Sequence, residues 1–269
     1  MKLGVTHAPY RSYPYEKAAQ LTADAGFDGI QVHLSWPDLD MFKYGSYVDL
    51  SGLTPELCAS VREAFIACGL EIYCLGVYTY LTVADDELRR RHVEYFKTLI
   101  RSAKALGTNV VVTESGPRAD GGFERTVECL QELAAEAERE GVIIAMEPSY
   151  RQAICCSEKA LRLIEKVGSD CIKVVMDPAN ILVYDSLENM FDVLRDHIIY
   201  GHAKDVNIDE KGDPTFPAAG EGQVDYHRYI ELLREHDIDV LIMEYVREDT
   251  VLDRKQWLEG VIAEVEGAG

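Results

Sequence analysis

Four apolar segments in the second half of the chain each run into a side chain that can bind a metal or carry a proton. The segments are residues 142–146, 172–176, 198–201 and 240–243, and the side chains that follow them are Glu147, Asp177, His202 and Glu244. Short apolar runs of this length are typical of buried strands. If the strands are parallel neighbours, their carboxyl ends share one edge of the sheet, and the four side chains converge there. Three carboxylates and one imidazole suit a divalent ion such as Mn, Mg or Co, with Zn as a further alternative.

The elements that position these side chains alternate along the whole chain. The predicted strands are 3–5, 29–36, 72–75, 110–112, 142–146, 172–176, 198–201 and 240–243. The predicted helices are 15–25, 54–69, 85–106, 123–139, 157–167, a short one from 187, 225–235 and 250–264. No change of composition marks a linker between these units. We therefore expect one (β/α)8 TIM-barrel domain of the α/β class over residues 1–269.

A doubly wound parallel sheet is the alternative fold, because it also alternates strands and helices. The count of eight strands favours the barrel. So do the polar residues at the ends of nearly all strands, because a barrel assembles its active site from all eight carboxyl ends. Neither GxGxxG after the first strand nor GxxxxGK[ST] occurs, so no dinucleotide or P-loop nucleotide site is predicted.

The composition of the chain restricts its partners. Lys and Arg total 27 against 47 Asp and Glu, which leaves a formal net charge of −20. Such an acidic surface repels phosphate backbones and anionic lipids, so we expect neither a nucleic acid nor a membrane as partner. The 7 cysteines have no disulfide-framework or zinc-ribbon spacing and indicate reduced thiols. With no signal-peptide pattern and no apolar run near the ~18 residues of a membrane span, we expect a cytoplasmic protein. The sequence leaves open whether the protein forms a homo-oligomer.

Five motifs at the later strand ends resemble a known superfamily. They are MEPS at 146–149, MDPAN at 176–180, GHAKD at 201–205, GEGQVDYHRYIELL at 220–233 and MEY at 243–245. Together they resemble the xylose isomerase-like TIM barrels, which include sugar epimerases, inosose dehydratases and endonuclease IV-like proteins. The resemblance covers essentially the whole chain. It implies that Glu147, Asp177, His202 and Glu244 hold one divalent metal ion, with Mn expected first.

The resemblance also implies a chemistry. In the ketose 3-epimerases of the superfamily, the two metal-binding glutamates act as acid and base, and Glu147 and Glu244 occupy their positions. A metal that chelates a carbonyl and its neighbouring hydroxyl acidifies the C–H between them and stabilises an enediolate. We therefore expect a metal-dependent isomerase or epimerase acting on a keto-sugar or another sugar or polyol derivative.

Two departures from the epimerase pattern keep other reactions open. Asn180 stands where the epimerases carry a histidine. The epimerases also tend to have an arginine soon after the metal-binding histidine, and residues 206–222 contain none. The sequence HAKDV is closer to inosose dehydratases, so a metal-dependent lyase that dehydrates an inosose or eliminates at a 3-keto-glycoside is the alternative. An endonuclease IV-type DNA repair enzyme needs more histidines and a basic DNA-binding face, which this chain lacks. A non-enzymatic binding protein on a barrel scaffold is a further alternative.

Further side chains at the strand ends are candidates for substrate contacts. Lys204 is a candidate catalytic residue that could hold a substrate hydroxyl or carbonyl, or it could form a structural ion pair with Asp205. The other candidate substrate-binding residues are His7, His33, Glu114, Asn180 and Glu221, each of which could instead have only a structural role. The polar stretch 206–222 is longer than most connections in compact domains, so we expect it to be a functional loop beside the pocket.

Overall fold

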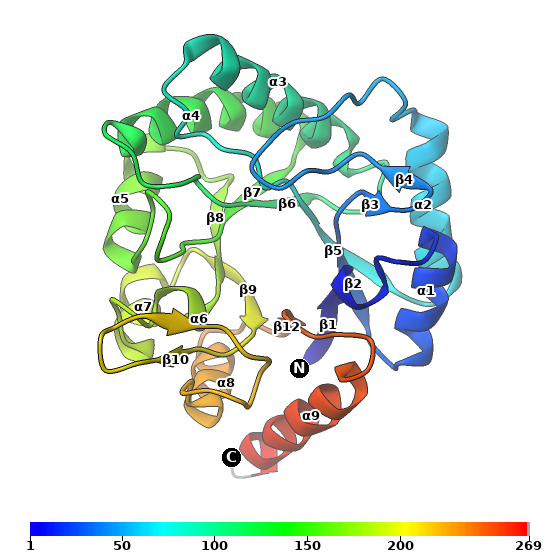
Figure 1. The fold of residues 1–269 in the computed structure, drawn as a ribbon, viewed down its shortest axis with the longest axis vertical. Helices are drawn as coiled ribbons and strands as arrows, with labels where there is room; N and C mark the ends of the chain where they lie inside the picture. The colour runs from blue at the N-terminus through cyan, green and yellow to red at the C-terminus, as the bar shows by residue number, and fades with distance from the viewer. Residues whose placement is uncertain (268–269) are drawn as a thin grey trace.

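The structure is a computed structural model that describes residues 1–267, and its centre is a closed barrel of parallel strands (Figure 1). Around the barrel the strands are β1 (Lys2–Thr6), β12 (Val240–Met243), β9 (Ile198–Ala203), β8 (Ile172–Met176), β7 (Ile143–Met146), β6 (Val110–Thr113), β5 (Glu71–Gly76) and β2 (Gly29–Val32). Strand β1 pairs with both β12 and β2, which closes the sheet. The predicted (β/α)8 barrel is confirmed. Residues 268–269 of the predicted domain lie outside the described residues.

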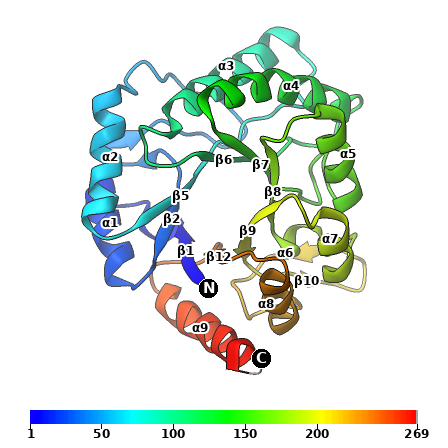
Figure 2. The same cartoon turned by 180° about the vertical axis from the view of Figure 1, so that it is seen from behind.

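Helices surround the barrel on its outer side (Figure 2). They are α1 (Tyr15–Asp24), α2 (Pro55–Ala67), α3 (Asp86–Ala103), α4 (Gly122–Glu140), α5 (Ser157–Val167), α7 (Leu187–Leu194), α8 (Tyr226–Glu235) and α9 (Val251–Gly267). Capping side chains fix where three of these helices begin. The side chains of Thr54, Asp85 and Asp225 each accept a hydrogen bond from a backbone amide in the first turn of the helix that follows. A further short helix, α6 (Pro178–Ile181), directly follows β8.

The barrel strands are buried on both faces, which explains why they read as continuous apolar runs. Successive strand residues point to opposite faces of a sheet. Ala145 and Val175 accordingly belong to one buried apolar cluster, whereas the preceding residues Ile144 and Val174 belong to a second, larger cluster. The second cluster also contains the buried faces of the helices.

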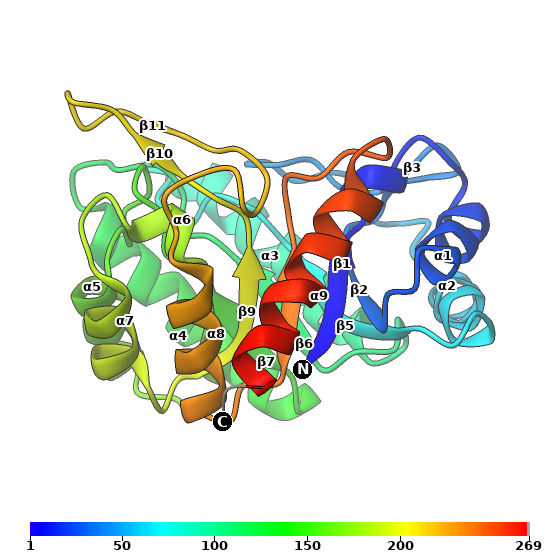
Figure 3. The ribbon, with the colours of Figure 1, turned by 90° about the horizontal axis from the view of Figure 1, so that it is seen from below.

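Because all the barrel strands are parallel, their carboxyl ends lie at one rim. Strand β9 pairs with β12 in the register His202 to Ile242, and β7 pairs with β8 in the register Met146 to Val174. In Figure 3 the arrow of β9 points toward the side where β10 (Asn207–Ile208) and β11 (Pro214–Thr215) lie. The residues that follow the strands therefore gather on this side of the molecule.

The prediction for the second strand is wrong at its carboxyl end. Strand β2 ends at Val32, and not at residue 36. The chain turns there, because the Ser35 amide donates to the His33 carbonyl over 2.7 Å. The next residues form a small antiparallel pair of β3 (Ser35–Trp36) and β4 (Leu39–Asp40). Trp36 is consequently buried, with its ring 5.9 Å from that of Phe65.

The predicted loop 206–222 is not wholly irregular. Strands β10 and β11 pair as an antiparallel hairpin within it. Its turn is closed by the Asp209 carboxylate, which accepts hydrogen bonds from the amides of Lys211 and Asp213. A side chain that bonds to amides two and four residues later stabilises a tight turn, so two short strands can pair across it.

The cysteines and the helices bear on two further expectations, reduced thiols and the lack of a membrane-spanning segment. The thiols are free, and several of them are buried. None of the helices in the described residues combines the length and the apolar character that a membrane span requires.

Candidate metal centre and active site

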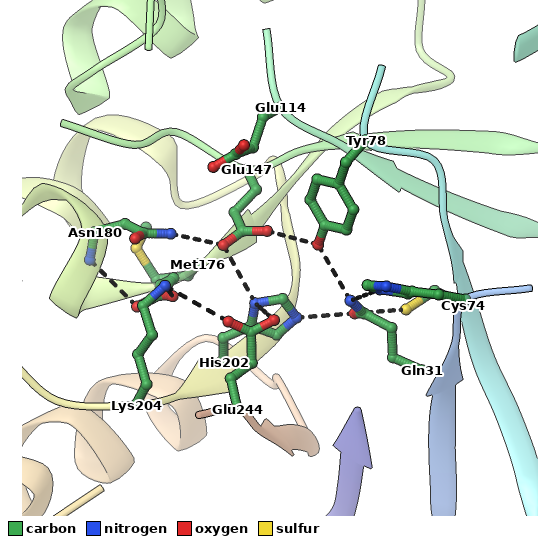
Figure 4. A network of polar contacts seen from close by, with 12 residues as sticks. Gln31, Cys74, Tyr78, Glu114, Glu147, Met176, Asn180, His202, Lys204 and Glu244 are labelled. Carbon is green, nitrogen blue, oxygen red and sulfur yellow. Dashed lines mark hydrogen bonds and ion pairs between the residues drawn. The ribbon is translucent and has the colours of Figure 1, made fainter. Parts of the chain in front are cut away.

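The four strand-end residues predicted as ligands lie together at the carboxyl ends of the barrel strands. Figure 4 labels three of them, Glu147, His202 and Glu244, among their polar neighbours. Glu147 follows β7, Asp177 follows β8, His202 lies within β9, and Glu244 follows β12. Each offers one ligand atom, and these atoms all lie within 4.8 Å of one another. Three of the side chains are buried and Glu244 is nearly so. The parallel register of neighbouring strands thus produces the convergence that the sequence predicted.

His202 is at the centre of the group. Its Nδ1 atom lies 3.6 Å from Glu147 Oε1 and 3.5 Å from Glu244 Oε1. The Lys204 ammonium lies beside the group, with Nζ 2.8 Å from Asp177 Oδ2 and 3.5 Å from Glu244 Oε2. The three carboxylates are therefore arranged around two nitrogen groups in a space that excludes most water.

Two buried atoms of this group indicate that it fits a cation. His202 Nδ1 and Asp177 Oδ2 are both buried and make no hydrogen bond within the described residues, although Asp177 Oδ2 is within ion-pair distance of Lys204. A buried polar atom without a partner costs about 1–3 kcal/mol. A divalent ion between these atoms would satisfy both, and three oxygens with one nitrogen are a suitable ligand set for it. The residues present therefore fit the metal that the sequence predicted.

The charges of the group are strongly coupled. Burial opposes ionisation of His202, but Glu244 and Glu147 outweigh it and raise the pKa of His202 to about 9. Burial alone would raise the pKa of Glu147, yet His202, Lys204 and the Tyr78 hydroxyl lower it to about 2. Burial raises the pKa of Glu244, and His202 only partly opposes this effect. The two glutamates thus have different environments.

Several neighbours orient Glu147 and His202. Asn180 donates from Nδ2 to Glu147 Oε1 over 2.6 Å, and the Tyr78 hydroxyl donates to Glu147 Oε2 over 2.8 Å. Gln31 lies against His202, with 3.0 Å between Gln31 Oε1 and His202 Nε2. Gln31 did not stand out in the sequence, although a polar residue within the apolar strand GIQV is the signal that could have found it.

A cavity of about 600 Å³ borders this group, and two of its members, Glu147 and Glu244, line it. Of the predicted substrate-binding residues, the structure places these in its lining: His7, His33, Glu114, Asn180 and Lys204. Glu221 is exposed, lies outside the cavity lining and is 3.4 Å from Arg254. The volume lies in the range of ligand-binding pockets.

Glu114 belongs to a separate polar group on the cavity wall. It accepts hydrogen bonds from the Tyr44 hydroxyl and from Gln152 Nε2. Burial, with the nearby charge of Glu147, raises the pKa of Glu114 to about 8. Tyr44 and Gln152 were not singled out in the sequence, because they come from loops that only the fold brings to Glu114.

Lys204 does not pair with Asp205, so this structural interpretation is wrong. The Asp205 carboxylate instead accepts hydrogen bonds from the amides of Val206, Gly220 and Val224. Asp205 thereby holds the two ends of the long loop together. The Lys204 ammonium faces the cavity, where it lies 4.8 Å from the ring centre of Tyr245.

Comparison with known proteins agrees with this geometry. The sequence profile of the xylose isomerase-like TIM barrels matches residues 19–263. The chain belongs to this family. Enzymes of the xylose isomerase-like family include sugar epimerases and dehydratases. No curated protein sequence matches this chain.

Solved structures support the fold of this xylose isomerase-like barrel. A 3-keto-D-glucoside 4-epimerase from E. coli is 18% identical, with a TM-score of 0.74, and the match covers 97% of this chain and 99% of that one. A D-psicose 3-epimerase from Clostridium cellulolyticum H10, solved with D-tagatose, is 16% identical, with a TM-score of 0.77 and coverage of 98% and 99%. The IolI protein with a bound zinc atom is 17% identical, with a TM-score of 0.78 and coverage of 98% and 99%.

Proposed function

We propose that this protein is a divalent-metal-dependent isomerase or epimerase acting on a keto-sugar or a related sugar or polyol derivative. The observation that carries the proposal is the convergence of Glu147, Asp177, His202 and Glu244, whose ligand atoms lie within 4.8 Å of one another beside a cavity that Glu147 and Glu244 line. Family members that are epimerases act on sugars of this kind, which supports the same substrate class here.

The four residues would hold one ion, with Mn expected first and Mg, Co or Zn as alternatives. When bound, the ion would polarise a substrate carbonyl and its neighbouring hydroxyl, and so acidify the C–H between them. Glu147 and Glu244 would remove and return the proton, because a positioned carboxylate within reach of a C–H can act as base and then as acid.

Other cavity residues would orient the substrate. Lys204 offers a buried ammonium that can donate to a hydroxyl or carbonyl oxygen. Glu114 can accept from a hydroxyl, and Asn180 is held by Glu147 at the edge of the same space. His7 and His33 also line the cavity, with their ring centres 4.4 Å apart. We propose these as substrate contacts, together with Glu221 if the substrate extends toward the long loop.

A lyase acting on the same site is the second candidate. Lys204 is a buried cationic donor next to Asp177 and Glu244, where it could hold a hydroxyl that leaves as water. The same base would then promote dehydration of an inosose or elimination at a 3-keto-glycoside. The two reactions share proton abstraction and differ in whether a C–O bond breaks.

Metal analysis and one substrate screen test the proposal. A crystal soaked in Mn²⁺ should show an anomalous peak among the four residues, and His202→Ala should lose the metal without unfolding. Keto-sugars and inososes incubated with the Mn-loaded protein in heavy water should be followed by NMR. Deuterium incorporation with an inverted or isomerised product supports the isomerase, and release of water or aglycone supports the lyase. A protein that binds no metal in the crystal or in solution contradicts both.

A further inference from the structure

Gln31 contacts the candidate metal histidine from inside the barrel. Its side chain comes from β2, is completely buried, and reaches across the barrel to β9 (Figure 4). Gln31 Oε1 lies 3.0 Å from His202 Nε2, the ring nitrogen on the far side from the carboxylates. His202 Nδ1, which faces the carboxylates, makes no hydrogen bond within residues 1–267. One nitrogen of the ring thus has an amide partner and the other faces the candidate ligands.

A β-bulge places Gln31 in this position. Ile30 of β2 pairs with Ile72 of β5, but the next residue, Gln31, pairs with Cys74, so that Tyr73 is the extra residue in β5. Bulges re-aim side chains and are common beside active sites. Here the bulge brings Cys74 Sγ to 3.1 Å from Gln31 Oε1.

The surrounding groups favour one orientation of the Gln31 amide. Gln31 Nε2 donates to the Tyr78 hydroxyl over 3.1 Å and also lies 3.2 Å from His33 Nε2, and the hydroxyl donates its own proton to Glu147. A reversed amide would place its carbonyl oxygen against a hydroxyl whose proton is already committed. It would also turn an N–H group toward the Cys74 thiol and His202 Nε2. Every group in this chain is satisfied when the Gln31 oxygen accepts from both Cys74 and His202.

We infer that Gln31 is a positioning residue that holds the Nε2–H group of His202 by a hydrogen bond and so turns Nδ1 toward the metal position. The hydrogen bond made by one ring nitrogen decides which nitrogen binds a metal. Through Tyr78, the same amide also orients Glu147, a second candidate ligand. One glutamine therefore supports two candidate ligands, one within β9 and one directly after β7. The inference rests on the proposed metal site.

The test uses Gln31→Met, which keeps the length of the side chain and removes the acceptor, and Gln31→Glu, which keeps an acceptor. Thr108→Val is a matched control, because Thr108 is also buried and donates to the Tyr73 carbonyl over 2.9 Å. Zn²⁺ and Mn²⁺ affinities are measured by competition with a chelator. Long-range ¹H–¹⁵N NMR of the zinc-loaded protein reads the tautomer of His202.

Gln31→Met should bind both metals about 10–100-fold more weakly, the size of effect known for outer partners of metal ligands. Gln31→Glu should retain most of the affinity and the Nε2–H tautomer, and Thr108→Val should match the wild type. An affinity of Gln31→Met within twofold of the wild type overturns the inference. If Gln31→Met does not fold, the wild-type spectrum still decides: zinc bound through Nε2 of His202 overturns the inference, and binding through Nδ1 supports it. A wild type that binds neither metal contradicts the proposed function instead.

Discussion

Lys204 and Asp177 form a buried ion pair between the ends of neighbouring strands, with Nζ 2.8 Å from Oδ2. Only 3% of Lys204 and 1% of Asp177 are exposed. Glu244 lies near the same ammonium. Burial lowers the pKa of Lys204, but Asp177 and Glu244 outweigh it and hold this pKa well above its usual value. Lys204 therefore compensates part of the negative charge of the metal-free site.

Lys204→Met should destabilise the metal-free protein, because it leaves buried carboxylates without their partner. Breaking a buried ion pair in this way costs about 3–5 kcal/mol. Mn²⁺ should restore more stability to the variant than to the wild type, since the ion supplies positive charge. Urea unfolding with EDTA and with Mn²⁺ measures both effects. Lys2→Met, which removes a surface pair with Glu71, is the control and should change little. Equal metal-free stability of wild type and Lys204→Met would contradict the prediction.

The two glutamates should differ when each is changed to glutamine. Both oxygens of Glu147 accept hydrogen bonds from side chains, whereas Glu244 accepts none within the described residues. In Glu147→Gln one amide N–H would face Tyr78 or Asn180, so metal affinity should fall along with turnover. Glu244→Gln should retain the metal while turnover falls by ~10²–10⁴-fold, as for a lost acid or base.

Mn²⁺ affinity, turnover and solvent deuterium exchange at saturating Mn²⁺ separate the two variants. In an epimerisation, the variant that lacks only the reprotonating acid should still exchange the substrate proton, and the variant that lacks the base should not. Rates near those of the wild type in both variants would show that these carboxylates do not carry the proton.

The long loop should influence substrate choice through Phe216. This side chain follows β11 and lines the cavity, where its ring centre lies 5.5 Å from that of Tyr150 and 6.2 Å from that of Tyr245. Removing one aromatic ring from such a wall costs about 0.5–1.5 kcal/mol of packing, which is roughly two- to tenfold in affinity. Phe216→Ala should therefore raise KM by this factor for sugars that contact the wall and leave kcat less affected.

Steady-state kinetics on two or more substrates measure this change. Phe123→Ala is a suitable control, because Phe123 lies on α4 outside the cavity lining. It has a cation, Arg162, over its ring, as Phe216 has Lys204. An unchanged order of substrate preference in Phe216→Ala would count against a role of this loop in specificity.

His7 should make stability depend on pH in the acidic range. Burial, with the charge of Arg11, lowers the pKa of His7 from 6.5 to about 4. Between these values the unfolded chain binds a proton that the folded protein does not. The free energy of unfolding therefore falls as the pH drops from 6.5 to 4, by up to about 1.4 kcal/mol per pH unit from this residue.

His7→Asn removes this contribution, so the wild type should lose more stability than the variant over the same pH range. Urea unfolding of both proteins at pH 4.5, 5.5, 6.5 and 7.5 compares them, and His236→Asn serves as a control at a position on the outer side of the barrel. Parallel pH profiles for wild type and His7→Asn would mean that His7 is not held neutral in the folded protein.

Local patterns were sufficient to predict the barrel and the four convergent residues. An apolar run that ends in a carboxylate or imidazole carries its own signal, and the parallel order of barrel strands then brings Glu147 and Glu244 to one rim. Helix starts at Thr54 and Asp225 were equally readable, because a capping side chain bonds to an amide only three residues away.

Tertiary structure decided which groups are partners across the barrel. Lys204 bonds to Asp177 and not to its neighbour Asp205, because adjacent strand ends lie closer to its ammonium than the next residue along the chain, whose carboxylate is held by loop amides. Gln31 and His202 are 171 positions apart in the sequence, and their contact depends on a β-bulge that no local sequence pattern predicts. Side-chain contacts of this kind depend on the strand register and on which side chains point into the barrel. Both are determined only when the sheet closes.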